Sequence, residues 1–470
     1  MPPKMLGRTL LPSLLALAVG SWLIAGCTSG MVTSNSTTGN STGPTGASFV
    51  VGTDAPMAAV TSFAVQLSAI NAYTSTDCSG TGVSLISAQT VDFARYNGLQ
   101  SLIDMNDVQA GTYNCVSITL GTATLGYLDT TNPEPTITTE AATLSTTSLT
   151  YPLASPMIVA QNGAPVGLHM DFDLRKSIQV DSNNQITGDV TPTFTVKAVN
   201  NSDPGAYIDE FIAAVTGTPT TDSFTVQGPH GRTFTINVNG QTEWDGGASL
   251  STLNSSSIVE ISGSLDRADA TIDADEVGLI SDKGFYAAGQ VTYVNPSSGP
   301  ANSFDLYVRG TLPTGTGVTD GNIATVDLSG SEKYSIYWMH GPLAQFLFNP
   351  SGLLAGQHVA VGGPATGATS GSSLSVTRVM LRDWGFNGTV VPGSENDGNG
   401  TFQMQVTGFA GVLIPEKVTV YIAGNCQFRD GWTGISDVTD NANVRVVGLL
   451  LKDPTSGDPV IVGHYVDDMN

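Results

Sequence analysis

The chain has 470 residues and a formal net charge of −23, because 40 Asp and Glu outnumber 17 Lys and Arg. This acidity argues against a nucleic-acid partner, since phosphate contacts require clustered Lys and Arg. A hydrophobic share of 40% is sufficient for folded cores. The four cysteines are too few for a small disulfide-packed scaffold. The length predicts roughly three or four domains.

Residues 1–26 are typical of a secretory signal peptide. Lys4 and Arg8 precede an apolar stretch that is too short and too interrupted for a membrane-spanning helix. The segment ends in Leu-Ile-Ala-Gly before Cys27, which resembles the lipobox of bacterial lipoproteins. The resemblance implies cleavage before Cys27 and its acylation, and an ordinary signal peptide with an incidental cysteine is the alternative. Thr28, in place of Asp, implies sorting to the outer membrane of a Gram-negative bacterium.

Residues 27–48 are expected to comprise the lipidated cysteine and a flexible tether. The stretch after Cys27 is uncharged and rich in Gly, Ser, Thr and Asn, a composition typical of a random-coil linker. About 20 such residues have a root-mean-square span of roughly 25 Å. Such a tether would hold a folded body off a membrane surface.

Beyond the tether, the sequence predicts strands. Short runs such as residues 234–238 and 418–422 alternate apolar and polar residues, which indicates strands with one buried face. No segment sustains a 3.6-residue apolar period, although residues 98–105 are compatible with a short helix because their apolar residues share a helical face. We therefore predict an all-β chain.

The first predicted module, residues 49–200, is a β-sandwich. It contains Thr-Asp-Ala-Pro at 53–56, Gly-Thr-Tyr at 111–113 and Asp-Phe-Asp-Leu-Arg-Lys-Ser at 171–177. These motifs, in this order, resemble the bacterial domain-of-unknown-function family 4382. The resemblance implies a secreted or lipid-anchored β-sandwich with no established activity. Cys115 departs from the family pattern, which usually has a polar residue at that place.

The rest of the chain repeats four landmarks three times, which divides it into units at residues 206–283, 284–383 and 384–470. One landmark is a strand that closes on a glycine, namely Gly263, Gly362 and Gly448. Five short strands per unit predict small OB-like Greek-key β-barrels in tandem, whose closure removes exposed sheet edges. The pattern resembles a second family of unknown function, numbered 5666, which occurs in tandem in bacterial envelope proteins.

The cysteines after the signal peptide have different expected states. Cys78 and Cys115 lie in the same module of a secreted chain, where disulfides persist, so a bridge between them is the favoured prediction. Two buried thiols are the alternative, because spacing alone does not fix the geometry. Cys426 stands alone and is expected to be a buried, inert thiol.

A row of polar residues on one predicted strand is a candidate metal site. Asp171 and Asp173 are two residues apart and therefore point to one face, together with His169 and Arg175. Such carboxylates could bind a hard cation such as calcium. The favoured interpretation is a solvated face on which Arg175 offsets the two carboxylates.

Two acidic loops, at residues 395–400 and 266–276, invite the same calcium hypothesis. Neither has the ligand spacing of an EF-hand. The first loop is typical of a β-hairpin tip, because Asn-Gly and Asp-Gly favour such turns. Calcium is the only cofactor that the sequence suggests.

The sequence contains no established catalytic motif. Gly-x-Ser-x-Gly, His-Glu-x-x-His and Walker motifs are absent, and the histidines are scattered singly. They are His169, His230, His340, His358 and His464. A site assembled from distant residues is the alternative, but we predict that the protein is not an enzyme.

The leading hypothesis is a non-catalytic structural, adhesive or ligand-presenting role at the cell envelope, with a glycan or an envelope protein as partner. The alternative is an array of carbohydrate-binding modules at the cell surface. Its aromatic platforms would be Trp338, Trp384 and Trp432, for which core packing is an equal alternative. Three aromatic residues recur at one repeat position and are expected in the cores, namely Trp244, Phe346 and Phe428.

Overall fold

The computed structural model describes residues 44–469 apart from short gaps. The expected signal peptide, Cys27 and most of the tether lie outside the described residues. Among the residues that are described, no helix is both long and apolar enough to cross a membrane. The gaps are 56–59, 97–100, 130–131, 164–165, 182–185, 201–206, 228–232, 267–270, 283, 313–317, 319, 338–345, 365–372, 415–416 and 430.

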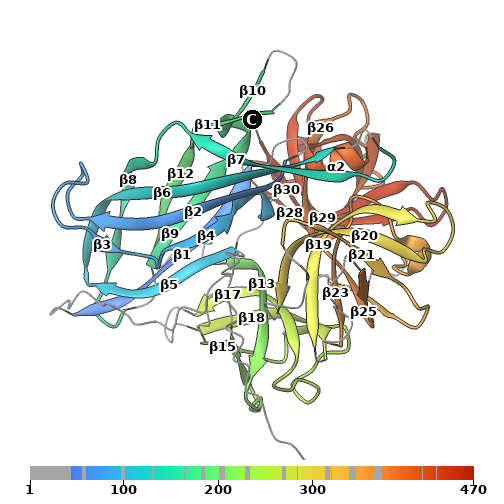
Figure 1. Ribbon diagram of the computed structural model, residues 1–470, viewed down its shortest axis with the longest axis horizontal. Helices are drawn as coiled ribbons and strands as arrows, with labels where there is room; N and C mark the ends of the chain where they lie inside the picture. The colour runs from blue at the N-terminus through green and yellow to red at the C-terminus, as the bar shows by residue number, and fades with distance from the viewer. Residues whose placement is uncertain are drawn as a thin grey trace, which may run out of the picture.

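The first module is a sandwich of two β-sheets (Figure 1). One sheet has the order β12-β9-β1-β5, and the other has the order β10-β11-β7-β6-β2-β3, with β4 beside β2 and β8 beside β6. Burial alternates along β2, as the period-two pattern predicts. The elements are β1 (Thr45–Ala55), β2 (Val60–Tyr73), β3 (Val83–Ser84), β4 (Gln89–Asp92), η1 (Phe93–Arg95), β5 (Ser101–Gln109), β6 (Gly111–Asp129), β7 (Thr136–Leu144), β8 (Ser148–Val159), β9 (Val166–Asp173), α1 (Leu174–Ser177), β10 (Ile178–Val180), β11 (Ile186–Val190) and β12 (Phe194–Val199).

Two local expectations for this module differ from the structure. β1 begins at Thr45, so the last residues of the expected tether are part of the sandwich. Residues 101–105, expected in a short helix, belong to strand β5. The apolar pattern of β5 is misleading because both of its faces are buried. Ile103 packs in the sandwich core, whereas Leu102 and Met105 pack against the next module.

The remaining strands form three barrels of one topology. When the short strands β16 and β22 are left out and β24 and β25 are counted as one strand, each barrel has five strands. The first strand lies between the second and the fourth, and the third strand runs parallel to the fifth. The third barrel closes in the order β26-β27-β28-β30-β29. An all-β chain with a sandwich and three OB-like barrels is therefore confirmed.

Barrel 1 consists of β13 (Tyr207–Thr216), β14 (Ser223–Gln227), β15 (Thr233–Asn237), β16 (Glu243–Asp245), β17 (Ile258–Asp266) and β18 (Thr271–Ser281). Barrel 2 consists of β19 (Phe285–Asn295), β20 (Ser303–Leu312), β21 (Ile323–Asp327), β22 (Lys333–Ile336), η4 (Pro350–Gly352), β23 (His358–Gly363), β24 (Ser373–Ser375) and β25 (Arg378–Arg382). Barrel 3 consists of β26 (Trp384–Val390), β27 (Thr401–Thr407), α2 (Gly408–Leu413), β28 (Lys417–Arg429), η6 (Ile435–Asp437), β29 (Asn443–Lys452) and β30 (Pro459–Asp468).

The recurring glycine of the repeat has a steric cause in barrels 1 and 3. A Cβ atom on Gly263 would lie 2.1 Å from the carbonyl oxygen of Asp273, and one on Gly448 would lie 2.1 Å from that of Val462. Each glycine lies in the fourth strand of its barrel, where the fifth strand crosses closely. A larger residue would push these two strands apart, which explains why the landmark is a glycine.

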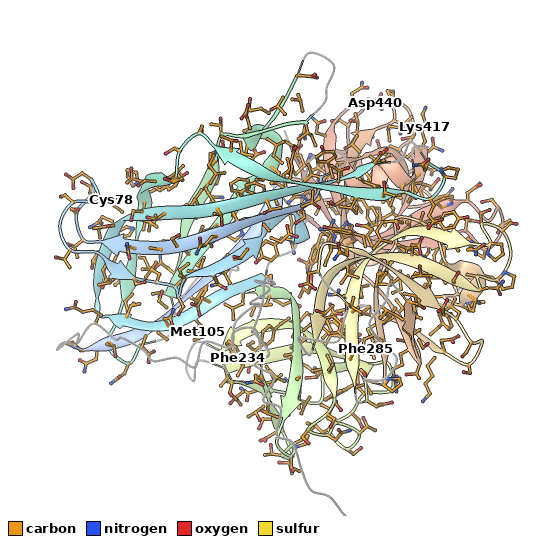
Figure 2. All side chains as sticks on the ribbon, viewed as in Figure 1. Cys78, Met105, Phe234, Phe285, Lys417 and Asp440 are labelled. Carbon is orange, nitrogen blue, oxygen red and sulfur yellow. A yellow bond between two sulfur atoms is a disulfide. The ribbon has the colours of Figure 1, made fainter. Side chains whose placement is uncertain are left out.

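The modules form a cluster in space rather than an extended row. Figure 1 shows the sandwich on one side and the three barrels gathered against it. The sandwich contacts barrel 1 through an apolar interface in which Phe49, Leu102 and Met105 share a cluster with barrel 1 residues. Figure 2 shows Met105 and Phe234 on the two sides of this interface.

A disulfide joins Cys78 to Cys115, at the end of the sandwich that lies far from the barrels (Figure 2). Cys115 lies in β6 and is 1% exposed, whereas Cys78 lies in the loop after β2 with a positive φ of 56°. The bond ties an exposed loop to a core strand. Cys426 is a partly buried free thiol, and burial raises its pKa to about 12. This shift suppresses the reactive thiolate form.

We expect Cys78→Ser to lower the unfolding free energy of the sandwich by about 3–4 kcal/mol, because the disulfide closes a loop of 37 residues. The substitution leaves the buried thiol of Cys115 in place and adds no polar group to the core. Chemical denaturation measures the change, with unfolding monitored by far-UV circular dichroism, which reports on the backbone and requires no tryptophan in the sandwich. Addition of a reductant should destabilise the unsubstituted protein equally and the variant not at all.

Candidate functional site

The row of polar residues predicted to share one face of β9 ends where the chain enters the short helix α1. Asp173 is the last residue of β9 and the N-cap of α1, and its Oδ1 accepts a hydrogen bond from the Lys176 N–H at 3.0 Å. Its Oδ2 lies 2.7 Å from Lys176 Nζ. Arg175 belongs to α1 and not to the strand. The interpretation that Arg175 shares the face and offsets the carboxylates was therefore wrong, because the chain turns at Leu174 and Lys176 takes that place.

Asp171 has different surroundings from Asp173. It lies between Thr53 and Thr195 in the sheet, and its Oδ1 is buried without a hydrogen-bond partner in the described structure. Burial raises its pKa, and the positive charge of Arg445 in barrel 3 lowers it. Within the described residues, no group of three or more His, Cys, Asp or Glu side chains is placed to hold a metal ion. Calcium at Asp171 and Asp173 remains a prediction.

The two acidic loops carry structural contacts where they are described. At residues 395–400 the backbone forms a tight turn closed by hydrogen bonds between Asn396 and Thr401, as expected of a hairpin tip. Of the segment 266–276, residues 267–270 lie outside the described part. Asp273 accepts a hydrogen bond from Asn237 at 2.9 Å.

A cluster of buried charged side chains lies where barrels 1 and 2 meet. Arg382, the last residue of β25, is 2% exposed. Its Nε donates to Glu260 Oε2 at 2.5 Å and its Nη2 donates to the other oxygen of Glu260. Nη2 also lies 3.1 Å from Glu210 Oε1. Glu210 lies in β13 and Glu260 in β17, so the cation of barrel 2 binds two carboxylates of barrel 1.

The pKa values of these groups reflect competition between burial and pairing. Burial raises the pKa of Glu260, and the Arg382 charge opposes that rise. Burial lowers the pKa of Arg382, but the charges of Glu260 and Glu210 outweigh it and raise the pKa above its ordinary value. The bidentate geometry is that of a charge-assisted pair. Each partner would be costly to leave buried alone.

The residue after Arg382 connects barrels 2 and 3. His358 Nδ1 in β23 donates to the Asp383 carbonyl oxygen at 3.3 Å, and His464 Nδ1 in β30 lies 3.2 Å from Asp383 Oδ2. Trp384, which begins β26, is 1% exposed and lies 4.1 Å from the His358 ring, centroid to centroid. Asp383, which links barrel 2 to barrel 3, is therefore contacted by a histidine from each of these barrels.

His358 is neutral in this arrangement. Because its Nδ1–H donates to a carbonyl, Nε2 is the acceptor, and it lies 3.5 Å from Arg382 Nη1. Burial lowers the pKa of His358 well below its ordinary value, and the charge of Arg382 lowers it further. The histidine extends the network of Arg382 without adding a second buried cation.

The sandwich is joined to the same place through Arg309 of β20. Arg309 Nη1 donates to the carbonyl oxygen of Ala94 in η1 at 2.6 Å. Its guanidinium carbon lies 4.9 Å from the centroid of the Trp384 ring and 5.3 Å from that of Tyr307. Cation–π contacts of this kind are strongest when desolvated. Segments from all four modules thus meet around residues 382–384, which we call the junction.

Other cations also bridge modules. Arg378 of barrel 2 donates to the Gly246 carbonyl oxygen of barrel 1 at 2.6 Å and lies 3.1 Å from Asp282. Lys452 of barrel 3 donates to the carbonyl oxygen of Ser351 in barrel 2 at 2.5 Å. In a chain with few basic residues, these side chains serve contacts between modules.

The junction is built for docking rather than for binding a substrate. Arg382, Glu260, His358 and His464 are each at most 3% exposed, so a ligand would reach them only if the modules separated. Sequence reasoning did not identify this cluster, because its members are single residues far apart along the chain. The one local indication in the sequence was the tripeptide Arg-Asp-Trp at residues 382–384, which spans the predicted boundary between the second and third repeats.

The tryptophans proposed as sugar platforms do not form a series. Trp384 is buried in the junction, which excludes it as a platform. Trp432 is partly buried against the barrel 3 core, and Trp338 lies outside the described residues. Phe346 is buried in the barrel 2 core, and the other two recurrent aromatic residues pack against their cores, namely Trp244 and Phe428.

We expect Arg382→Met to lower the unfolding free energy by about 3–5 kcal/mol, because it leaves Glu260 and Glu210 buried without their cation. Thermal unfolding should separate into more than one transition as the modules uncouple. Small-angle scattering should show a larger radius of gyration. The control is Arg175→Met on the exposed turn, and equal effects of the two substitutions would contradict this role of Arg382.

His169 gives the sandwich a dependence on pH. Burial and the opposite cross-strand Lys197 lower its pKa from 6.5 to about 4. The unfolded chain takes up this proton below pH 6.5, whereas the folded chain does so only near pH 4. The stability that neutral His169 contributes is therefore complete above pH 6.5 and is lost as the pH falls toward 4. The loss should reach about 3 kcal/mol relative to His169→Gln. Denaturation curves of both proteins at several pH values measure it, and parallel curves would exclude it.

Comparison with protein families identifies one part of the chain. Residues 48–187 match the model of a domain of unknown function, DUF4382. The match covers most of the sandwich, from β1 into β11, and confirms the expectation for the first module. No curated protein matches the chain. Over these residues the sandwich is therefore similar to a domain of unknown function, DUF4382.

Proposed function

We propose that the protein is a non-catalytic, lipid-anchored component of the cell envelope, with a structural, adhesive or ligand-presenting role. The observation that carries this proposal is the junction, where Arg382 and its neighbours hold four modules in one body. A body of fixed shape on a flexible tether suits a spacer or a display scaffold. Buried ion pairs of this kind are associated with specific docking more than with stability.

The envelope location rests on the N-terminal sequence. The lipobox resemblance proposes Cys27 as the acylated residue, and several acyl chains give stable anchoring where one gives marginal binding. Thr28 favours the outer membrane. The resemblance of the barrels to the envelope family numbered 5666 agrees with this location.

A role without catalysis is favoured by the nature of the most perturbed titratable groups. Perturbed pKa values mark functional sites when the groups line a cleft. Here Glu260, His358 and Arg382 are enclosed between modules and paired with one another. Hydrolysis of an envelope polymer that a single substitution abolishes would overturn the proposal. The expected partner is a glycan or an envelope protein, and the excess of acidic residues disfavours nucleic acid.

We expect Cys27→Ser to release the protein from the membrane fraction, because the serine cannot carry the thioether-linked lipid. The measurement is membrane fractionation of producing cells together with mass spectrometry of the mature N-terminus. The unsubstituted protein should begin at an acylated Cys27, and Cys426→Ser should leave both results unchanged. An unmodified Cys27 in the mature protein would refute the anchor.

A further inference from the structure

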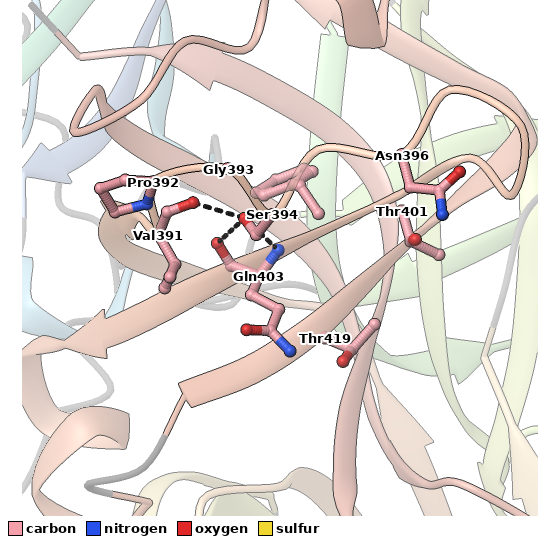
Figure 3. A pocket seen from close by; sticks show the side chains of 9 residues that line it. Val391, Pro392, Gly393, Ser394, Asn396, Thr401, Gln403 and Thr419 are labelled. Atoms are coloured by element: carbon pink, nitrogen blue, oxygen red, sulfur yellow. Dashed lines mark hydrogen bonds between the residues drawn. The ribbon is translucent and has the colours of Figure 1, made fainter.

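Barrel 3 carries a hollow that is separate from the junction. The loop of residues 391–400, between β26 and β27, lies over β27 and β28 and borders an open hollow of about 340 Å³ (Figure 3). This volume is within the range of small-molecule sites, about 300–1,000 Å³. Polar, uncharged side chains line most of it, namely Ser394, Asn396, Thr401, Gln403 and Thr419.

The loop over the hollow is held in place by hydrogen bonds. Ser394 Oγ donates to the carbonyl oxygen of Val391 at 2.6 Å and accepts from the Gln403 N–H at 3.0 Å (Figure 3). The Gly393 N–H donates to Asp440 Oδ1 at 2.7 Å. The Asn396 Oδ1 accepts a further bond from the Asn399 N–H at 3.1 Å. These bonds fix the wall of the hollow and leave the side chains of Gln403 and Thr419 available. A preorganised wall reduces the entropy cost of binding a ligand.

The same place is built differently in the other two barrels. The loops there are shorter, residues 217–222 in barrel 1 and 296–302 in barrel 2, against residues 391–400 in barrel 3. In each barrel this loop joins the first two strands. The longer loop is therefore a specific feature of barrel 3, and it supplies Ser394 and Asn396 to the hollow.

The cross-strand pair that lines the hollow of barrel 3 differs in its hydrogen bonds from the corresponding pairs in barrels 1 and 2, and this difference supports a ligand-binding role for barrel 3. Gln403 of β27 lies opposite Thr419 of β28, and the corresponding pair of barrel 2 is Asp305 and Thr325. In barrel 2 the Thr325 hydroxyl donates to Asp305 Oδ1 at 2.8 Å. In barrel 1 the residue that corresponds to Gln403 is Thr225, and its hydroxyl donates to the carbonyl oxygen of Thr216 in β13 at 2.5 Å. In barrel 3 the exposed Gln403 and the half-buried Thr419 both line the hollow, and among the described residues neither the Gln403 amide nor the Thr419 hydroxyl forms a hydrogen bond with protein.

The chemistry of these groups selects the ligand. The amide of Gln403 offers a donor NH2 and an acceptor oxygen, Asn396 offers its NH2 because its Oδ1 accepts from the Asn399 N–H, and the hydroxyls of Thr401 and Thr419 can donate or accept. Neighbouring hydroxyl groups of a sugar ring are complementary to such a set. The Asp440 carboxylate behind the loop makes an anionic ligand unfavourable. OB-like barrels bind oligosaccharides through the second and third strands and the adjoining loop.

We propose that the hollow of barrel 3 binds a neutral sugar, one unit of an oligosaccharide or polysaccharide, through Gln403, Thr419 and Asn396. This inference rests on the ligand-presenting form of the proposed function, and it assigns that role to a single barrel. It differs from an array of equivalent modules, because the residues that correspond to Gln403 in barrels 1 and 2, Thr225 and Asp305, form hydrogen bonds within their own barrels.

The test is isothermal titration calorimetry of the full chain with neutral hexasaccharides of glucose, xylose, mannose and galactose, and with anionic oligogalacturonate. At least one neutral hexasaccharide should bind. Gln403→Leu and Thr419→Val should each weaken that binding about tenfold, which corresponds to the loss of one hydrogen bond or two. Both residues lie on the barrel surface or near it, and circular dichroism will verify that the variants fold.

The matched control is Thr325→Val, which removes the corresponding hydroxyl of barrel 2 and should leave affinity unchanged. Absence of binding by every neutral sugar, binding of the anionic sugar alone, or equal affinity of the Gln403 variant and the unsubstituted protein would each overturn the proposal. Failure of this assay would leave the result of the Cys27 experiment untouched, so the two proposals are tested separately.

Discussion

The contact of Arg382 with Glu260 and Glu210 is the constraint on which the arrangement of the modules depends most sharply, because each charge would be costly to bury alone. An arginine at the end of one barrel is buried against two carboxylates of another, beside an apolar cluster that the two barrels share. Because the next two residues are the linker to barrel 3, the same contact also sets where that barrel begins. His358 and His464 then hold Asp383, and Arg309 connects the sandwich. The cost of leaving any of these charges unpaired in the interior favours one arrangement over the alternatives.

The net charge of −23 acquires a structural meaning from these contacts. Basic residues are scarce, and several of them act between modules rather than on the open surface, namely Arg309, Arg378, Arg382 and Lys452. With 40 Asp and Glu against 17 Lys and Arg, the chain has too few cations to neutralise its carboxylates one for one. A surface with uncompensated negative charge keeps a protein soluble and repels polyanions. The charge is thus a consequence of how cations are used in the fold as much as a property of its partners.

The three barrels share a backbone plan and differ in their polar details. Strand order and the close-packed glycines Gly263 and Gly448 recur, because closure of a small barrel constrains the backbone in the same way each time. The loop between the first two strands is free of this constraint and varies in length. In barrel 3 this loop is longer, and the side chains of Gln403 and Thr419 beside it form no hydrogen bond with protein among the described residues. A common fold thereby supports different roles at corresponding positions.

Local pattern was sufficient to predict the class of fold, the sandwich followed by three barrels, and the family of the first module. Period-two alternation and recurring glycines are properties of a few neighbouring residues, so they can be read without knowing the partners. Pattern failed where burial came from another module. β5 looked helical because both of its faces are covered, and Arg175 left the strand because α1 begins one residue earlier. Only the tertiary structure decided that Trp384 is enclosed and that Arg382 meets Glu260, since the docking of separate modules brings together residues that no spacing along the chain connects.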